Sequence, residues 1–521
     1  MRRSDEESDE TRAGEPVLTL DETEPLELPS GTPAAHLAEA ELATAGLIKR
    51  WMTAPGGESA TGADVSSPLG QVAWAMYEWA RNPYVLLITI YIFAPYFTTT
   101  VVGDPVRGQA LWGDIASYAG FIIAVLAPFL GAIADAGGRR KPWIALYTAV
   151  IIAATLSMWT ALPGARGLQL LIIGALVVCG NVSFEFSAVF HNSMLPTIAS
   201  HRRVGSLSGL GLALGNASGI ILMLFMLIAF ALPGKVHWSF VPTQPLFGIS
   251  QALHEPERLA GPLEALWLLV FSVPLFLFTP DRPSVRMGLR KAMAAGVKSV
   301  IRTVRSLKHY RNVGHYLGAR AVFNDGMTGV LTFGGIYAAG TFHWGPLEMT
   351  AYGIELSIFA VIGGFFGGWL DDHLGSKRAI YVSIGGTAIA FALGLTMGPD
   401  RILWFIPYDP HAAPVWGAPF FKSWPELIYV GIVNFVAICI TAGYANSRTM
   451  LARIAPPEKM SEFFGIYSLS GTSTTFMAPL AVAALTSWTH SQRGGMMAIF
   501  FFLVAGLVWM AFVREERATA V

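Results

Sequence analysis

The sequence predicts an all-α polytopic membrane protein, a twelve-helix fold made of two pseudo-symmetric six-helix bundles. Three observations predict it. Hydrophobic residues make up 53% of the 521 residues and charged residues only 13%, about half the ~25% usual in soluble domains. Long stretches without Asp, Glu, Lys or Arg recur, such as 204–234 and 463–492. A turn pattern in the first half of the apolar body also returns in the second half, which indicates an internal repeat.

Charge is distributed unevenly along the chain. Residues 1–66 contain 14 acidic and 5 basic residues, whereas residues 67–521 contain 21 acidic and 30 basic residues. The first segment has the composition of a disordered chain and lacks the apolar run of a signal peptide. We therefore predict an acidic, disordered tail. The chain has only two cysteines, Cys179 and Cys439, which excludes a secreted disulfide scaffold.

Twelve stretches are long and apolar enough to cross a bilayer. A spanning helix needs about 20 mostly apolar residues, and its backbone polar groups must pair within the helix. Splitting the body at charge clusters and at Gly and Pro gives the predicted spans 72–98, 111–135, 142–162, 167–189, 207–232, 262–279, 314–339, 349–371, 379–397, 426–447, 463–487 and 494–513.

Basic residues gather in the loops of one side. An even number of spans places both termini on the same side. The loops of that side, with the central linker, contain eighteen Lys and Arg residues, and the opposite loops contain seven. Because basic loops stay in the cytoplasm, we predict that both termini are cytoplasmic. The opposite loops carry no N-x-[ST] site, which fits a bacterial inner (plasma) membrane.

The central linker separates the two halves. In it, Val297, Ile301 and Val304 recur at helical spacing, with Lys and Arg away from that stripe. We predict an amphipathic helix on anionic lipid headgroups; a site for a regulatory partner is the alternative. The predicted divisions are the tail 1–66, the first bundle 67–279, the basic linker 280–312, the second bundle 313–513 and the cytoplasmic C-terminus 514–521.

The repeated turn follows the second and the eighth predicted spans. It reads GAIADAGGRRK from residue 131 and GWLDDHLGSKR from residue 368, with Gly, Asp and Gly at the same offset. Small residues allow close helix contact, glycine allows a sharp turn, and an Asp there can pair with a basic residue or a helix N-terminus. We predict a conformational latch, with a basic topogenic loop as the alternative. Its residues are Gly131, Asp135, Gly138, Arg139, Arg140, Gly368, Asp372, Gly375, Lys377 and Arg378.

This turn resembles the signature of the major facilitator superfamily, which implies that the twelve-helix fold is major-facilitator-like. Four further motifs resemble the UMF-type, vacuole-effluxer-like branch, whose fungal members export amino acids from the vacuole. They are YEWARNPY from Tyr77, FHNSMLP from Phe190, FNDG from Phe323, and Ser447-Arg448 followed by EFFGIY from Glu462. The resemblance implies that spans one, four, seven and ten line a central cavity. The sequence departs from it at Ala136, where a basic residue is usual, and at Glu78 and residues 81–83.

Ionisable residues inside spans are costly and mark candidate functional sites. Glu78 and Arg81 lie on one face of the first span. We predict that Glu78, Glu185 and Asp325 face the cavity and that at least one carries a proton or ion coupled to transport. Structural ion pairs are the alternative. The candidates for substrate binding or ion coupling are Glu78, Arg81, Asn82, Asn181, Glu185, Arg320, Asn324, Asp325, Asn434 and Tyr444.

These features predict a secondary, ion-coupled carrier for an amino acid or a similar metabolite. A sugar symporter of the same architecture and a non-transporting receptor or scaffold are the alternatives. The sequence contains no phosphate-binding Walker loop for ATP-driven transport, because its Gly-Lys pair, Gly234-Lys235, is followed by Val and not by Ser or Thr. Enzymes are disfavoured, because His254-Glu255-Pro256 lacks a second His and no G-x-S-x-G elbow occurs. We expect no cofactor, no metal and no nucleic-acid partner, and a monomer in the lipid bilayer that meets a small-molecule solute.

Overall fold

The computed structural model describes residues 58–59, 64–135, 139–200, 203–281, 298, 310–455, 467, 470–471 and 473–515. These residues belong to one compact unit, Ala54–Val521. The predicted tail and the predicted amphipathic helix of the linker lie almost wholly outside the described residues, and both stay predictions.

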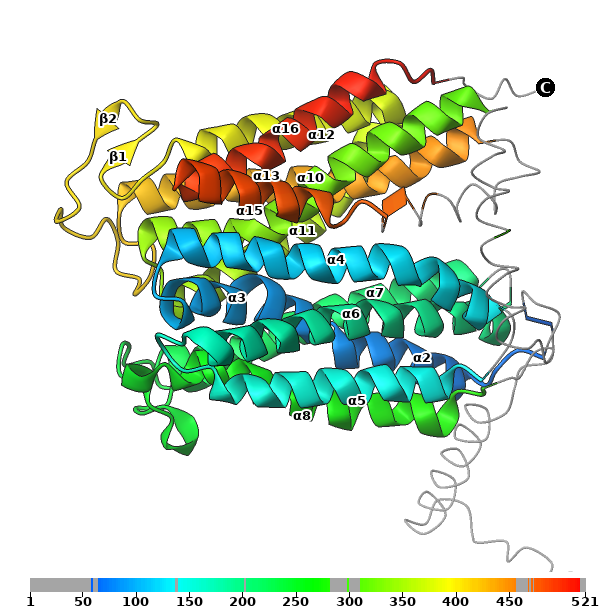
Figure 1. Cartoon of the computed structure of the whole chain (residues 1–521), viewed down its shortest axis with the longest axis horizontal. Coiled ribbons are helices and arrows are strands. Elements are labelled where there is room, and N and C mark those ends of the chain that lie inside the picture. The colour runs from blue at the N-terminus through cyan, green and yellow to red at the C-terminus, as the bar shows by residue number, and fades with distance from the viewer. Residues whose placement is uncertain are drawn as a thin grey trace, which may run out of the picture. The chain divides into compact units, whose positions relative to one another are not determined.

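The first half begins with a long, irregular span. Ser67 caps it through its Oγ, which accepts the N–H of Gly70 at 3.2 Å. The helices of this half run parallel or antiparallel to one another (Figure 1). They are α2 (Pro68–Arg81), the π-helical segment Val85–Tyr91, α3 (Phe93–Tyr96), the π-helical segment Phe97–Val101, α4 (Pro105–Asp135), α5 (Lys141–Ser157), α6 (Gly167–Ile198), α7 (Val204–Met226) with the π-helical segment Leu227–Ala231, and α8 (Glu255–Phe278).

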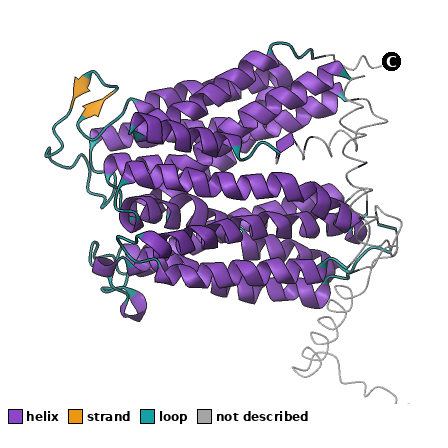
Figure 2. Ribbon diagram, viewed as in Figure 1, coloured by secondary structure: helices purple, strands orange, loops and turns teal. Residues whose placement is uncertain are grey.

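The second half repeats this arrangement with more regular helices. They are α10 (Arg311–Phe342), α11 (Pro346–Leu374), α12 (Ser376–Leu395), α13 (Trp424–Ile454), α15 (Met477–Thr489) and α16 (Gln492–Met510). Among the described residues, strand structure is confined to a two-stranded antiparallel hairpin and isolated bridges (Figure 2). In the hairpin β1 (Arg401–Ile402) pairs with β2 (Ile406–Pro407), and Ile402 lies opposite Ile406.

The packing order of the helices is the same in both halves. In the first half α4 and α5 pack on α6, α5 packs on α8, and α2 packs on α7 and α8. In the second half the equivalent pairs are α11 and α12 on α13, α12 on α16, and α10 on α15 and α16. Shared helix order and shared contacts are what a duplicated six-helix bundle requires. The structure therefore supports the internal repeat that the sequence predicted.

Ten of the described helices are long and apolar enough to cross a membrane. The twelve predicted spans correspond to these ten and to two further helices, α10 and α15. α10 carries Arg311, Arg320 and Asp325 and is not among the ten. The described part of α15 is only 13 residues long, and most of the first half of its predicted span lies outside the described residues. The chain is an all-helical protein with multiple membrane spans.

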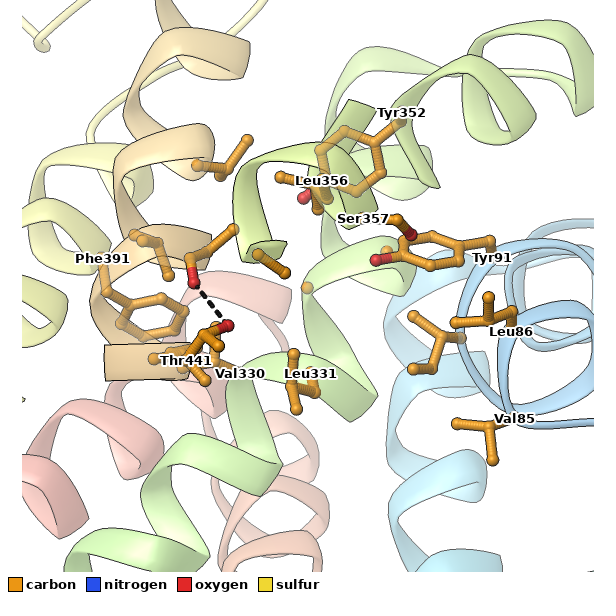
Figure 3. A pocket seen from close by; sticks show the side chains of 18 of the residues that line it. Val85, Leu86, Tyr91, Val330, Leu331, Tyr352, Leu356, Ser357, Phe391 and Thr441 are labelled. Carbon is orange, nitrogen blue, oxygen red and sulfur yellow. Dashed lines mark hydrogen bonds between the residues drawn. The ribbon is translucent and has the colours of Figure 1, made fainter. Parts of the chain in front are cut away.

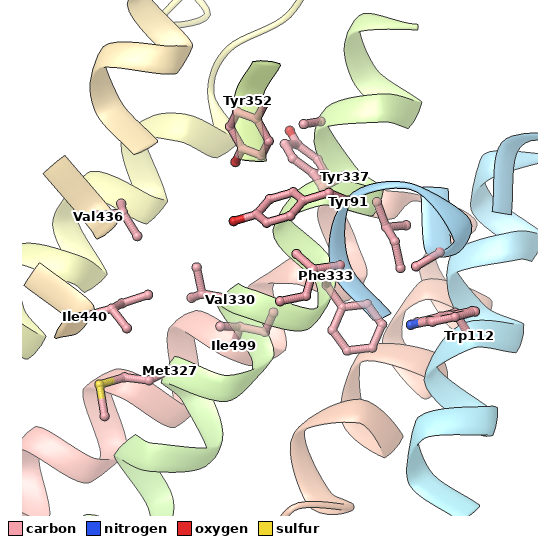
Figure 4. Close-up of a cluster of buried hydrophobic side chains, with 14 of the residues drawn as sticks. Tyr91, Trp112, Met327, Val330, Phe333, Tyr337, Tyr352, Val436, Ile440 and Ile499 are labelled. Atoms are coloured by element: carbon pink, nitrogen blue, oxygen red, sulfur yellow. The ribbon is translucent and has the colours of Figure 1, made fainter. Parts of the chain in front are cut away.

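Side chains from both halves meet in one buried cluster. Tyr91 and Trp112 of the first half share it with Phe333 and Ile499 of the second (Figure 4). Large apolar side chains also lie exposed on the outer helices; Phe365 of α11 is 79% exposed. Exposed apolar surface of this kind faces lipid in a membrane protein.

We name the two ends of the bundle by their loops. The latch side is the end where Arg139–Arg140 and Gly375 connect helices. The loop side is the opposite end, with residues 232–254 and the segment 396–423 that carries the hairpin (Figure 1).

Candidate functional site

A cavity of about 610 Å³ lies between helices of both halves. The first half contributes the middle of the first span and one face of α7, and the second half contributes α10, α11, α12, α13 and, through Met496, α16. Figure 3 shows Tyr91, Leu86 and Val85 opposite Tyr352, Leu356 and Ser357 of α11. Ligand pockets usually measure ~300–1,000 Å³, so the space suits a small solute.

None of the described residues that line this cavity carries a charged side chain. Its polar groups are mostly engaged already. Ser357 Oγ donates to the carbonyl of Gly353 at 2.7 Å, and Thr441 Oγ1 donates to that of Ala437 at 3.1 Å (Figure 3). Asn82 Nδ2 and Asn216 Oδ1 lie 3.5 Å apart. The lining therefore suits an uncharged, largely apolar surface of a solute.

Five tyrosines give the cavity its aromatic character, and only one of them was predicted as a site residue. They are Tyr91, Tyr337, Tyr352, Tyr429 and Tyr444. Tyr91 and Tyr352 meet edge to face, with ring centroids 5.8 Å apart. Tyrosines in apolar helices are common packing residues, so the sequence gave no signal that separated these from the rest of the core.

The first span changes its helical form where it reaches the cavity. Pro83 has no backbone N–H to donate to the preceding turn, and a π-helical segment, Val85–Tyr91, follows. π-Helical turns are frequently found at functional sites. The side chains of Val85, Leu86, Ile90 and Tyr91 from this segment line the cavity.

Glycines of α7 let that helix pack closely against the first span. A Cβ added at Gly211, Gly215 or Gly219 would lie within 3.4 Å of Glu78, Asn82 or Leu86, respectively. The glycine-rich stretch of the fifth span is thus a packing stripe. This close packing brings α7 to the cavity. The resemblance implied that the fourth span, α6, would line the cavity, but no residue of α6 is among the lining residues.

Glu78 and Arg81 pair within a buried cluster of the first half. Arg81 Nη2 lies 3.0 Å from Glu78 Oε1, and its guanidinium lies 4.5 Å from the ring centroid of Phe184. His191 Nδ1 lies 3.3 Å from Glu78 Oε1, while His191 Nε2 donates to the carbonyl of Trp74 at 2.9 Å. The charge on Glu78 is compensated here, and neither Glu78 nor Arg81 lines the cavity.

The two predicted site residues of α6 lie away from the cavity. Asn181 Oδ1 accepts the hydroxyl of Tyr84 at 2.9 Å, so it ties α6 to the first span. Glu185 lies one turn further along α6 with an exposed side chain. Neither residue is among those that line the cavity, and a role for them in transport stays a prediction.

On α10, Arg320 and Asp325 both bind the segment around α15. Arg320 Nη1 donates to the carbonyl of Tyr467 at 2.7 Å, and its guanidinium stacks on that ring at 3.4 Å. Asp325 Oδ2 accepts the N–H of Ala478 at 3.2 Å, in the first turn of α15, where a carboxylate stabilises a helix. Asn324 is buried beside them. None of the three lines the cavity.

The two predicted site residues of α13 differ in position. Tyr444 lines the cavity, and its hydroxyl lies 3.3 Å from Thr328 Oγ1. Asn434 Nδ2 donates to Glu355 Oε1 at 2.6 Å and is not among the lining residues. Of the ten predicted candidates, the cavity therefore contains Asn82 and Tyr444.

The second copy of the repeated turn forms an ion pair, but through the neighbour of the predicted acid. Asp371 Oδ2 lies 2.7 Å from Arg453 Nη2, and Asp371 Oδ1 accepts the hydroxyls of Ser376 and Thr449. Asp372 is exposed. The helix turns Asp371 inward, towards α13, and leaves Asp372 on its outer face. Gly375 has a φ of 82° and ends α11.

The turn at Gly375 is also bound by the end of the described chain. Glu515 accepts the backbone N–H groups of Ser376 and Lys377 at 3.0 and 3.3 Å and pairs with Arg453 at 3.2 Å. Lys377 Nζ donates to the carbonyl of Val513 at 2.6 Å. Gly368 faces open space, and Arg378 is exposed.

The first copy of the turn is described in part. Gly138 lies outside the described residues, as do the side chains around Gly131 and Asp135. Arg139 is exposed, and Arg140 Nε donates to Ser193 Oγ of α6 at 2.9 Å. Asp281 accepts the backbone N–H groups of Arg140 and Lys141 at 3.0 and 3.1 Å.

Comparison with known proteins identifies the family. The chain matches the family described as "Vacuole effluxer Atg22 like" over residues 115–205 and 201–520. It belongs to the Atg22-like family. The chain is 23% identical over 474 residues to the uncharacterized MFS-type transporter YxiO of Bacillus subtilis, covering 86% of this chain and 96% of YxiO.

More distant relatives agree with this assignment. Autophagy-related protein 22 of Yarrowia lipolytica is 19% identical, covering 60% of this chain and 50% of its own length; the chain thus spans about half of that fungal relative. The crystal structure of a D-xylose-proton symporter matches with a TM-score of 0.58 at 12% identity, covering 86% of this chain and 97% of the symporter, which shows the fold alone.

The family membership decides the class of protein. The chain is a transporter of the major facilitator superfamily and an integral, multi-pass membrane protein, and this family consists of transporters rather than enzymes. The protein therefore lies in a membrane and transports a solute.

Proposed function

We propose that this Atg22-like protein is a secondary carrier that moves an apolar amino acid, or a similar neutral metabolite, by alternating access. The observation that carries the proposal is the cavity between the halves, whose lining has no charged side chain and five tyrosines. Aromatic faces and aliphatic side chains match an apolar side chain. Asn82 and Asn216, with the backbone of the π-helical segment, supply polar contacts for the rest of the solute.

The cavity disfavours a sugar. A sugar would bring many hydroxyl groups into a space where the hydroxyls of Ser357 and Thr441 already donate within their own helices. Polar groups that lose water without a new partner cost free energy. A charged side chain such as that of lysine would add a further charge to the α-ammonium and α-carboxylate groups that every amino acid carries, and this charge would meet no counter-charge in the described lining.

Alternating access fits the contacts between the halves. Near the loop side, Gln109 Nε2 of α4 donates to Thr486 Oγ1 of α15 at 2.9 Å, and Gln492 Nε2 of α16 donates to the carbonyl of Pro105 at 3.1 Å. These bonds join the two halves near the loop side. Rocking of the two bundles about the cavity would break them, while the turns at Arg140 and Gly375 act as latches on the other side.

The direct experiment is a solute panel on purified protein. We expect L-phenylalanine and L-leucine to raise the midpoint of thermal unfolding, because a ligand that binds only the folded state stabilises it by mass action. L-Lysine, L-glutamate and D-xylose should leave the midpoint unchanged. Uptake of radiolabelled L-phenylalanine into proteoliposomes then checks transport. A shift with D-xylose alone would favour a sugar symporter and overturn the proposed substrate class.

We also propose how the protein is oriented in the membrane, that it is a monomer, and that its tail is dispensable for transport. We place both termini in the cytoplasm of a bacterial plasma membrane, on the basic loops of the latch side, and take the carrier as a monomer. A variant without residues 1–57 keeps every residue that the structure describes. A carrier without this segment should keep transporting, whereas a scaffold that works through its tail should fail.

A further inference from the structure

Glu264 is a buried acid of the sixth span that the transport cavity does not use. Its exposed fraction is 0%. Within the described part of the chain, neither carboxyl oxygen has a hydrogen-bond partner. Ala260 and Leu268, one turn before and after it on α8, are also fully buried and belong to the main hydrophobic cluster. An ionised carboxylate in such surroundings is strongly unfavourable.

Among the described residues, no basic side chain compensates Glu264. The elements packed against α8 are α2, α3, α5, the π-helical segment Val85–Tyr91 and the short helices Met158–Thr160 and Gln251–Leu253. Their ionisable side chains are Tyr77, Glu78, Arg81, Tyr91, Tyr96, Lys141 and Tyr147. Arg81 pairs with Glu78, and Lys141 donates to the carbonyl of Phe276 at 2.9 Å, three helical turns from Glu264. Arg258 of α8 itself donates to the carbonyl of Trp159.

Tyr84 is the polar residue next to Glu264. Its main chain lies beside the carboxyl without reaching hydrogen-bond geometry, and its hydroxyl donates to Asn181. Tyr84 immediately precedes the π-helical segment Val85–Tyr91. Glu264 therefore lies against the first span at the residue that directly precedes the π-helical segment.

The cavity lies at the same irregular stretch. Asn82, Val85 and Leu86, on either side of Tyr84, line it, whereas Tyr84 is turned inward towards Asn181 and does not. Loss of a proton from Glu264 would place a charge against the back of this stretch. Water entry or a shift of the first span would then relieve that charge, and a shift would alter the wall of the cavity.

We propose that Glu264 is a proton-binding site that couples the protonation of the sixth span to the shape of the cavity through Tyr84 and the π-helical segment. This inference rests on the proposed function as a carrier. The neutral acid favours the conformation described above. Release of its proton to water favours a conformation in which the carboxylate is hydrated, so the proton shifts the balance between the two states.

A proton fits this site better than a metal cation. Sodium- and calcium-type cations need several oxygen ligands, and the surroundings of Glu264 are the apolar side chains of the core. Glu78 is a weaker candidate, because Arg81 and His191 already face its carboxylate.

The first test observes the proton itself and needs no substrate. Infrared difference spectra of the full-length protein in lipid, recorded between neutral and alkaline pH, should show the carbonyl stretch of a protonated carboxylic acid. This band should lose intensity in Glu264→Gln and keep it in the control Asp114→Asn, which alters an exposed acid of α4. A spectrum of Glu264→Gln that is identical to that of the wild type would overturn the proposal.

A second test links the proton to transport, with L-phenylalanine as the probe. Glu264→Gln should keep exchange of the probe across proteoliposomes but lose at least tenfold of its stimulation by a pH gradient. Glu264→Met, which has a similar volume, should fold and behave alike. Full stimulation in both variants would refute coupling through Glu264. If L-phenylalanine is not carried at all, the substrate proposal fails, and the infrared test still decides the proton site.

Discussion

Asp281 and Glu515 hold equivalent positions in the two halves of the carrier. Asp281 follows α8 and accepts the first backbone N–H groups of α5, from Arg140 and Lys141. Glu515 follows α16 and accepts those of α12, from Ser376 and Lys377. In each half, an acid after the last helix caps the third helix. Four donors at a helix start lack a partner within the helix, and both halves satisfy two of them in this way.

Removal of either cap should destabilise its own half. We expect Asp281→Ala and Glu515→Ala each to lower stability by about 0.5–2 kcal/mol, the usual cost of a lost N-terminal cap. Asp372→Ala removes an exposed acid and should change stability by less than about 0.5 kcal/mol. Thermal unfolding in detergent measures all three. Equal effects of the three variants would contradict the capping role.

The ion pair of Asp371 should control turnover. Asp371→Asn weakens the contact with Arg453 and should reduce the transport rate far more than the apparent affinity, because the pair lies at the latch and outside the cavity. Asp372→Asn should behave like the wild type. Initial rates of uptake over a range of solute concentrations separate the two parameters. A loss of affinity with an unchanged maximal rate would rule out the latch.

Close packing of α4 on α15 should make Gly113 sensitive to a single methyl group. A Cβ at this position would lie 2.9 Å from both the Cβ of Ala483 and the carbonyl oxygen of Pro479. We expect Gly113→Ala to cost about 1–3 kcal/mol, as overpacking usually does. Gly431→Ala, which meets open space, should be neutral or stabilising by up to about 1 kcal/mol. Thermal unfolding again gives the comparison.

Filling the cavity should abolish solute binding without unfolding the protein. Ser357→Trp places an indole in the cavity, whereas Ile358→Trp, one residue on, replaces a side chain that is 53% exposed on the outer surface. The first variant should lose the thermal shift given by L-phenylalanine, and the second should keep it. Binding that survives in Ser357→Trp would move the substrate site elsewhere.

Labelling should place the loop side outside the cell. Phe247 and Phe405 are 85% and 86% exposed there, and Arg139 and Arg378 are exposed on the latch side. After replacement of Cys179 by Ser, cysteines at the first two positions should react with an impermeant maleimide added to intact cells. Cysteines at the other two should react only after permeabilisation. Reaction of Arg139→Cys and Arg378→Cys from different sides would refute the twofold arrangement.

The sequence could predict the spans and the repeat because both depend on local composition. It missed Glu264 because of a helix boundary. The predicted sixth span begins at residue 262, which leaves Glu264 at the membrane edge, whereas α8 begins at Glu255 and carries Glu264 more than two turns inward. Pro256 in the first turn and acids at 255 and 257 are the usual signs of a helix start, and they mark the true boundary.

The lining of the cavity depends on long-range packing, which the sequence did not reveal. Glu78 and Asp325 are costly inside a span, and the sequence predicted them as cavity residues for that reason. The structure instead gives each a partner from another helix, His191 of α6 and the amide of Ala478 in α15. Which helix face meets the cavity is decided by contacts such as the glycine stripe of α7 against Asn82 and Leu86.

The paired caps at Asp281 and Glu515 have a mechanical consequence. Each acid links the residues after the last helix of its half to the start of the third helix of the same half. These two links would therefore survive a movement of one half relative to the other. In the proposed rocking motion, the contacts that must break are those between the halves, such as Gln109 with Thr486 and Gln492.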